Sequence, residues 1–326
     1  MRRKIILYTN CSKGGVTSVI RNRALAEPDT EITAIFLNDR DGSSSFTDLA
    51  NVNVRLVRRD RAISYLKYLL NSFTFDSVSI LSEPEIANGV SAYSSVPVEY
   101  EFHSSDNTVI ERELQILDLY RLDAIIVPSA FLRDKVSSLI SRQSRLNILV
   151  EPNLVDTGTF IESFSDRFAS FAHFDHGNIV LWVGRFDKGK GYKQFLRILG
   201  ALPPSFHGVA VVSLEADPSR AAEFFYEADC NNVSSRVTLF SNLSPKDMAT
   251  LFGMARNSNG VLLSTSLMES FGYAVAEALA VGTPVVAYDL PALRELHDPS
   301  GLVHFVPIGS FHDAVKAITS ATSVPL

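Results

Sequence analysis

A chain of 326 residues is longer than one hydrophobic core usually supports, so its length predicts two domains. Its formal net charge of -6 argues against a nucleic-acid binder, because such proteins need a basic face to displace counterions. Two cysteines, Cys11 and Cys230, are too few for a disulfide framework. No segment approaches the ~20 apolar residues of a membrane-spanning helix. We therefore expect a soluble protein in the cytoplasm.

Short apolar runs rich in β-branched residues alternate with segments of helical period along the chain. Continuous apolar strands that alternate with helices indicate parallel sheets covered on both faces. In the first half we expect strands at residues 4–9, 31–37, 52–57, 77–82, 96–102, 124–129 and 146–151. In the second half we expect strands at residues 178–183, 208–214, 236–241, 260–265 and 284–288.

Two successive sets of strands predict an α/β protein with two Rossmann-like domains that face a central cleft. The polar stretch 153–177 separates the two sets. We place the boundary within it, which gives domains 1–157 and 158–326. Open α/β sheets bind ligands at the carboxyl ends of their strands, so the loops that follow the strands are the first places to look for chemistry.

A glycine pair follows the first predicted strand in the stretch CSKGGVTSVI. Gly14 and Gly15 stand where the strand turns into a helix. Glycine lets backbone N–H groups approach an anion at a helix N-terminus, so the pair predicts a phosphate contact. An ordinary tight turn explains it equally well, because the G-x-G-x-x-G fingerprint of dinucleotide-binding proteins is absent.

A cationic loop, VGRFDKGKG, follows the strand at 178–183. Arg185 leaves the end of the strand, and Lys190 and Gly191 precede the next helix. Arginine offers a planar fork of donors and lysine a point charge, which together suit a diphosphate. The alternative is a basic turn that is merely solvated. The combination of several cations and glycines at one strand-to-helix junction favours the diphosphate.

Two glutamates, Glu269 and Glu277, bracket the segment ESFGYAVAE. We expect a helix to begin near Ser270–Phe271 and to end at Gly282. Eight residues that rise ~1.5 Å each would separate the glutamates by roughly 12 Å. Glycosidase carboxylate pairs are ~5 to 9.5 Å apart, so the two are not predicted to form such a pair. They fit two ends of one long polar ligand, with a hexose at one carboxylate, a ribose at the other and a diphosphate between them.

These motifs resemble the retaining, GT-B-fold glycosyltransferases of family 4, also known as glycosyl transferases group 1. The resemblance is specific only within 179–289 and sparse in the first half. The family pattern G-R-x(4)-K-G is matched by Gly184, Arg185, Lys190 and Gly191, and E-x(7)-E by Glu269 and Glu277 with Phe271 and Gly272 between them. In the first half, the glycine loop and the stretch EFHSS, with His103 at a strand end, are similar to the family.

The resemblance implies a role for each matching position of the second half. Arg185 and Lys190 would neutralise the departing diphosphate, which is the main electrostatic contribution in such a reaction. Glu269 would hold hydroxyls of the transferred sugar, and Glu277 would hold the ribose. Backbone N–H groups of Ser270, Phe271 and Gly272 would assist Glu269.

In the first half, the resemblance implies that Gly14 and Gly15 approach the phosphates and that His103 touches the donor sugar near its anomeric carbon. The reaction would retain anomeric configuration by same-face attack, assisted by the leaving phosphate. No metal or other cofactor is expected, since the nucleoside diphosphate sugar is a co-substrate and the cations do the work of Mg²⁺. The cluster His173, Asp175 and His176 is not predicted to bind metal, because nothing nearby completes a ligand set.

Three departures from the family pattern leave alternatives open. Leu290–Glu295 stands where the family has two glycines before a glutamate, and Ser270 stands where glycine is commoner. The chain also ends without the long final helix of the family, so we expect looser closure or a surface supplied by another chain. A catalytically idle subunit that binds glycans or stabilises a partner transferase, or a nucleotide-sugar epimerase, are the alternatives.

The segment RLVRRDRAISYLKYLL combines cations with an apolar stripe predicted to include Ile63, Leu66, Leu70 and Phe73. A solvated face and docking on anionic lipid both explain it, and docking would place the protein at the inner face of the membrane. The function that the family resemblance implies is transfer of a hexose to a hydroxyl of a glycan or lipid-linked acceptor, in cell-surface polysaccharide or glycolipid assembly.

Overall fold

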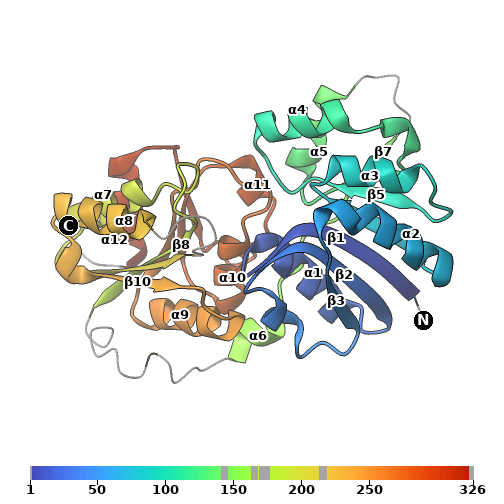
Figure 1. The fold of residues 1–326 in the computed structure, drawn as a ribbon. Coiled ribbons are helices and arrows are strands. Elements are labelled where there is room, and N and C mark those ends of the chain that lie inside the picture. The colour runs from blue at the N-terminus through green and yellow to red at the C-terminus, as the bar shows by residue number, and fades with distance from the viewer. Residues whose placement is uncertain (1, 141–145, 163–167, 169–176, 213–218, 323–326) are drawn as a thin grey trace. The chain divides into compact units, whose positions relative to one another are not determined.

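The structure of the chain is a computed structural model that describes residues 2–140, 146–162, 168, 177–212 and 219–322 (Figure 1). The chain divides into two compact units, Met1–Leu154 and Val155–Leu326. Each unit is a parallel sheet flanked by helices, which confirms the predicted α/β class with two Rossmann-like domains. The cluster of His173, Asp175 and His176 lies outside the described residues.

The first unit contains a seven-stranded sheet in the order β3-β2-β1-β4-β5-β6-β7. All seven predicted strands are present. The strands are β1 (Arg2–Ser12), β2 (Thr30–Arg40), β3 (Val52–Leu56), β4 (Ser77–Leu81), β5 (Val98–Glu101), β6 (Ala124–Val127) and β7 (Asn147–Val150). The helices are α1 (Gly15–Ala26), α2 (Ala62–Ser72), α3 (Pro84–Ser91), α4 (Asn107–Ile116) and α5 (Ala130–Leu139), with 3₁₀ turns η1 (Ser43–Phe46), η2 (Arg59–Arg61) and η3 (Leu119–Arg121).

The second unit contains a six-stranded sheet in the order β10-β9-β8-β11-β12-β13. Its strands are β8 (Asn178–Gly184), β9 (Phe206–Val212), β10 (Val237–Ser241), β11 (Val261–Ser264), β12 (Val285–Tyr288) and β13 (Val303–Val306). Its helices are α6 (Thr157–Glu162), α7 (Tyr192–Ala201), α8 (Arg220–Cys230), α9 (Pro245–Asn257), α10 (Tyr273–Val281), α11 (Pro291–Arg294) and α12 (Phe311–Thr322), with a 3₁₀ turn η6 (Ser234–Arg236). The edge strand β13 was not predicted, because its four residues, VHFV, include an exposed histidine.

Both sheets are covered on both faces, as continuous apolar strands require. In β1, Ile5 and Leu7 belong to one hydrophobic cluster, and Ile6 between them belongs to another. The same alternation occurs in β8, where Leu181 faces one cluster and Trp182 faces the other. Each sheet is therefore packed between two layers of helices, with alternate side chains of its central strand buried on opposite faces.

Strand order places the candidate loops at the switch point of each sheet. β1 lies between β2 and β4, and the chain proceeds outward from it in both directions. β8 lies in the same way between β9 and β11. Ligands of open α/β sheets bind outside the carboxyl ends of the strands at such a point. The loops after β1, β8 and β11 are the ones that carry the predicted glycine, cation and glutamate motifs.

The apolar stripe predicted for α2 is only partly right. Leu66 is fully buried, whereas Ile63 and Phe73 are 38% and 46% exposed. Ala62 and Leu69 complete the buried face instead. A spacing of three or four is satisfied by more than one set of apolar residues here, so the pattern did not identify the inward face.

Candidate functional site

The cationic loop after β8 is shaped by hydrogen bonds to Asp187. The Arg185 guanidinium, 66% exposed, forms an ion pair with Asp187 at 3.1 Å between Nη2 and Oδ2. The backbone N–H of Lys190 donates to Oδ1 of the same carboxylate at 3.0 Å. Asp187 thus connects the beginning and the end of the loop. The predicted Arg185 and Lys190 are both tied to it, one through its side chain and the other through its backbone.

Gly191 ends this loop in a conformation that only glycine adopts easily. Its φ is 69°, and it is the N-cap of α7. A Cβ atom at this position would lie 2.5 Å from the carbonyl oxygen of Thr265. The glycine of the motif is therefore required for a close approach between the loop after β8 and the loop after β11.

Thr265 fastens the two loops together from a fully buried position. Its Oγ1 accepts a hydrogen bond from the Trp182 indole N–H at 3.0 Å and lies 2.9 Å from the carbonyl oxygen of Gly191. The backbone N–H of Leu267 donates to the Gly189 carbonyl at 2.8 Å. Sequence reasoning missed Thr265, because one threonine at the end of an apolar strand gives no signal.

The two loops bring Lys190 and Glu269 into direct contact. Lys190 Nζ donates to Glu269 Oε1 at 2.5 Å, and the two side chains are 23% and 15% exposed. Lys190, the candidate phosphate-binding cation, therefore forms an ion pair with Glu269, the candidate sugar-binding carboxylate. Partial burial strengthens the attraction between Lys190 and Glu269 relative to that of a surface ion pair.

The helix after Glu269 begins later than predicted. α10 starts at Tyr273, and its N-cap Gly272 has a φ of 97°. Ser270 and Phe271 lie in the preceding loop, so Glu269 is not in the first turn of the helix. The estimate of roughly 12 Å between the glutamates assumed continuous helix and does not hold. The left-handed glycine, which the motif spacing did not predict, is what delays the helix.

Glu277 lies inside α10 in a different environment from Glu269. Its side chain is half-buried, and no described residue forms a hydrogen bond or ion pair with it. Burial raises the pKa of the Glu277 carboxyl to about 8. The structure thus gives the two glutamates opposite electrostatic states, with Glu269 ion-paired and Glu277 predominantly protonated at neutral pH.

The stretch where the family pattern has two glycines forms the short helix α11. Leu293 of α11 is buried, and a Cβ built on Gly272 would lie 2.2 Å from Leu293 Cδ2. Arg294 forms a two-pronged ion pair with Asp289 at 2.6 and 2.7 Å. Side chains, rather than glycine backbone, therefore pack against the start of α10.

In the first unit, Gly14 and Gly15 lie at the start of α1. Gly14 is its N-cap with φ −109° and ψ 177°, an extended conformation open to any residue. The Ser12 N–H donates to Thr17 Oγ1 at 3.2 Å, which holds the turn. The geometry is compatible with a phosphate contact and with an ordinary turn, as the sequence already indicated.

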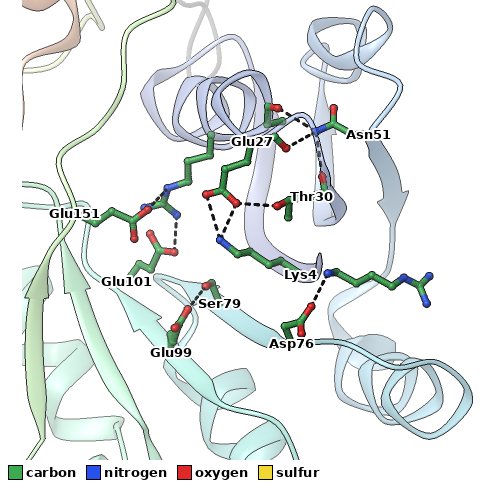
Figure 2. A network of polar contacts seen from close by, with 12 residues as sticks. Lys4, Glu27, Thr30, Asn51, Asp76, Ser79, Glu99, Glu101 and Glu151 are labelled. Carbon is green, nitrogen blue, oxygen red and sulfur yellow. Dashed lines mark hydrogen bonds and ion pairs between the residues drawn. The ribbon is translucent and has the colours of Figure 1, made fainter. Parts of the chain in front are cut away.

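His103 follows β5 and is held by a buried ion pair. Its Nε2 lies 3.0 Å from Oε2 of Glu101, which is fully buried. Arg23 Nη1 lies 2.8 Å from Glu101 Oε1, and Arg23 Nε lies 3.3 Å from Glu151 Oε1 (Figure 2). Burial alone would raise the pKa of Glu101, but Arg23 and His103 hold it at about 2. Nothing in the sequence pattern pointed to Arg23 or Glu101.

Nearby carboxyl groups complete the polar network of Figure 2. Glu99 accepts a hydrogen bond from Ser79 at 2.8 Å, and burial together with Glu101 and Glu151 raises its pKa. Within the described ranges, no three histidine, cysteine, aspartate or glutamate side chains gather as a metal site would require. In the same part of the chain, no helix is both long and apolar enough to cross a bilayer.

Curated relatives match part of the chain. Phosphatidyl-myo-inositol mannosyltransferase of Mycobacterium leprae is 27% identical over 169 residues, 50% of this chain and 43% of that protein. An uncharacterized 41.2 kDa protein in the cps region of Klebsiella pneumoniae is 29% identical over 139 residues, 43% of this chain and 34% of that protein. The chain thus spans less than half the length of each.

Solved structures match nearly the whole chain in fold. Anabaena HepE in complex with UDP and glucose superimposes with a TM-score of 0.82 at 15% identity, over 98% of this chain and 89% of that one. Sucrose-phosphate synthase from Thermosynechococcus elongatus gives 0.78 at 17% identity, over 99% and 91%. The family model for glycosyl transferases group 1 matches residues 163–323. The second unit of the chain therefore belongs to the glycosyl transferases group 1, on the two-domain GT-B scaffold that its motifs indicated.

Proposed function

We propose that the protein is a retaining glycosyltransferase that moves a hexose from a nucleoside diphosphate sugar to a hydroxyl group of an acceptor. The observation that carries this proposal is the contact between Lys190 and Glu269, which joins the cationic loop after β8 to the glutamate loop after β11. A cation beside a carboxylate suits a ligand that carries a diphosphate next to a sugar. The group 1 family of the second unit supports the same reaction class.

In this proposal the transferred sugar leaves the diphosphate and bonds to the acceptor oxygen on the same face. The bond between the anomeric carbon and the phosphate oxygen breaks, and the acceptor proton passes to the departing phosphate. Arg185 and Lys190 stabilise the negative charge that develops on the diphosphate. Glu269 accepts hydrogen bonds from sugar hydroxyls, with Ser270, Phe271 and Gly272 beside it.

The remaining predicted contacts belong to the same proposal. Glu277 binds the ribose, Gly14 and Gly15 approach the phosphates, and His103 contacts the transferred sugar. Arg185 and Lys190 supply the positive charge, so the proposed reaction uses no metal and no further cofactor. The first unit binds the acceptor, a glycan or a lipid-linked sugar of cell-surface polysaccharide or glycolipid assembly.

The test is release of nucleoside diphosphate from a panel of UDP-, GDP- and ADP-sugars, with and without a chelator. The panel includes UDP-glucose, because the similar Anabaena protein binds UDP and glucose, and a mannose donor, because curated relatives are named mannosyltransferases. We expect slow hydrolysis of one donor that the chelator does not change. If no donor is hydrolysed and none raises the melting temperature, the proposal is wrong.

Two alternatives are decided by the same panel. The stretch Leu290–Glu295, which lacks the two glycines of the family pattern, favours an idle subunit, because glycines there would let a donor approach the backbone closely. An idle subunit would show neither hydrolysis nor donor binding. A nucleotide-sugar epimerase would convert its donor into another nucleotide sugar without an acceptor and without releasing the nucleoside diphosphate.

We further propose that the protein docks at the cytoplasmic face of a membrane through a surface that we call the basic face. Arg58 and Arg61 on this surface are 82% and 76% exposed. Close to them in the sequence, Leu56, Tyr68 and Phe73 are 55%, 55% and 46% exposed. A segment that combines exposed cations with exposed apolar and aromatic side chains suits an anionic lipid surface. A lipid-linked acceptor would be present at the same surface.

A further inference from the structure

The bond between His103 and Glu101 determines which nitrogen of the histidine carries a proton. An ionised carboxylate only accepts hydrogen bonds, and Arg23 together with His103 holds the pKa of Glu101 at about 2. At 3.0 Å from Glu101 Oε2, Nε2 must therefore be the donor. The hydrogen bond to Glu101 therefore fixes a proton on Nε2.

Arg23 holds the Glu101 carboxylate in place through an ion pair, and Glu101 in turn holds the His103 ring. Arg23 comes from α1, the helix that begins at Gly15, and it contributes a guanidinium that is only 11% exposed. Arg23 binds one oxygen of Glu101, which leaves the other oxygen for His103. The arginine is itself aligned by Glu151, which follows β7. The glycine-loop helix and the end of β5 are thereby joined through one buried ion pair.

We propose that Glu101 and Arg23 are positioning residues that hold His103 in one ring orientation with its proton on Nε2. The inference rests on the proposed function, in which His103 contacts the transferred sugar. Neither residue touches the substrate. Both act through the histidine. A carboxylate orients a histidine in the same way in many catalytic and metal-binding sites.

The competing explanation is that the buried ion pair serves stability alone. Buried ion pairs are weak evidence for stability, because desolvation costs offset their attraction. A substitution that keeps the shape of Glu101 but changes its hydrogen bonding separates the two explanations. In Glu101→Gln, the amide oxygen is drawn to the Arg23 guanidinium, so the NH₂ group faces Nε2. A donor at that point forces His103 into the tautomer with its proton on Nδ1.

The first measurement is the tautomer of His103, read from nitrogen NMR shifts of protein labelled in its seven histidines. The spectrum of His103→Gln identifies the signal. We expect the Nε2-protonated form in the unaltered protein, the Nδ1-protonated form in Glu101→Gln, and no change in Glu151→Gln, which is the matched control. An unaltered protein with its proton on Nδ1 overturns the inference, and this result needs no activity.

The second measurement is a double-mutant cycle on donor hydrolysis. We expect Glu101→Gln to lower kcat by about 100-fold, the loss that a displacement of about 1 Å in a reacting geometry produces. In the His103→Ala background, the same substitution is expected to change kcat by less than about twofold, because Glu101 then has nothing to position. An equal loss in both backgrounds overturns the inference. A protein that hydrolyses no donor refutes the proposed function, and the NMR result still decides the role of Glu101.

Discussion

Glu277 provides the most direct test of the site electrostatics, because its carboxyl group is half-buried with a pKa raised from 4.5 to about 8. Glu277→Gln keeps the shape of the side chain and removes its titration. In the unfolded chain the carboxyl ionises near pH 4.5, whereas in the folded protein it stays protonated to about pH 8. The folded protein therefore loses stability as the pH rises between these values and loses none below them.

The size of the effect follows from the pKa difference. Each pKa unit corresponds to about 1.36 kcal/mol, so between about pH 5 and pH 8 the buried carboxyl would destabilise the fold by at most about 4 kcal/mol. The side chain keeps some contact with solvent, and we take half of this value, about 2 kcal/mol. For a unit of this size, that corresponds to an increase in melting temperature of about 4 to 8 °C in Glu277→Gln.

The assay is calorimetric melting of the unaltered protein and of Glu277→Gln at about pH 4 and about pH 8. We expect equal melting temperatures at the lower pH and a gain for Glu277→Gln at the higher pH. Glu223→Gln is the control, because a hydrogen bond from Lys193 lowers the pKa of Glu223 and its loss cannot stabilise the fold at high pH. The same gain at both pH values, or none at the higher one, would refute the reasoning. If Glu277 holds the ribose, the stabilised variant also binds its donor more weakly.

Three further predictions concern the two loops and the basic face. Lys190→Ala is expected to lower kcat for donor hydrolysis by about 10²- to 10³-fold, and an unchanged kcat contradicts its role at the diphosphate. Gly191→Ala is expected to lower the melting temperature more than Gly282→Ala, since both glycines have positive φ but only Gly191 has a carbonyl oxygen within 2.5 Å of the added Cβ. Arg58→Glu with Arg61→Glu is expected to reduce sedimentation with phosphatidylglycerol vesicles at least about 10-fold, with phosphatidylcholine vesicles as the control. Equal sedimentation of the double variant would remove the basic face as a docking surface.

The sequence predicted the scaffold well because the scaffold depends on patterns that repeat. Each central strand is a continuous apolar run, as in ILY of β1 and VLW of β8, and such runs identify buried parallel strands. The strand β13 was missed because VHFV is short and lies at an edge, where alternating exposure weakens the pattern. The loops after the strands could be located from the sequence, because each apolar run ends where polar and glycine residues begin.

The interactions inside the site could be predicted only in part. The motif spacing identified Lys190 and Glu269, but their contact depends on a hydrogen-bonded threonine, Thr265, that no pattern marks. The late start of α10 depends on the φ of Gly272, which a sequence leaves undetermined because glycine adopts both hands. Contacts between single polar residues that lie far apart in the sequence leave no repeating pattern, so they cannot be predicted from the sequence.

The two glutamates of the motif differ in how their charge is accommodated, and this difference bears on donor binding. Glu269 is charged and already neutralised by Lys190, so an arriving diphosphate must share that lysine with it. Burial keeps Glu277 predominantly protonated at neutral pH, and a ribose hydroxyl that donates to it would favour its ionised form. Lys190 would then follow the new negative charge of the diphosphate, which leaves Glu269 free to accept hydrogen bonds from the transferred sugar. In the proposed function, a donor that binds at both ends would thus rearrange one ion pair and release one proton.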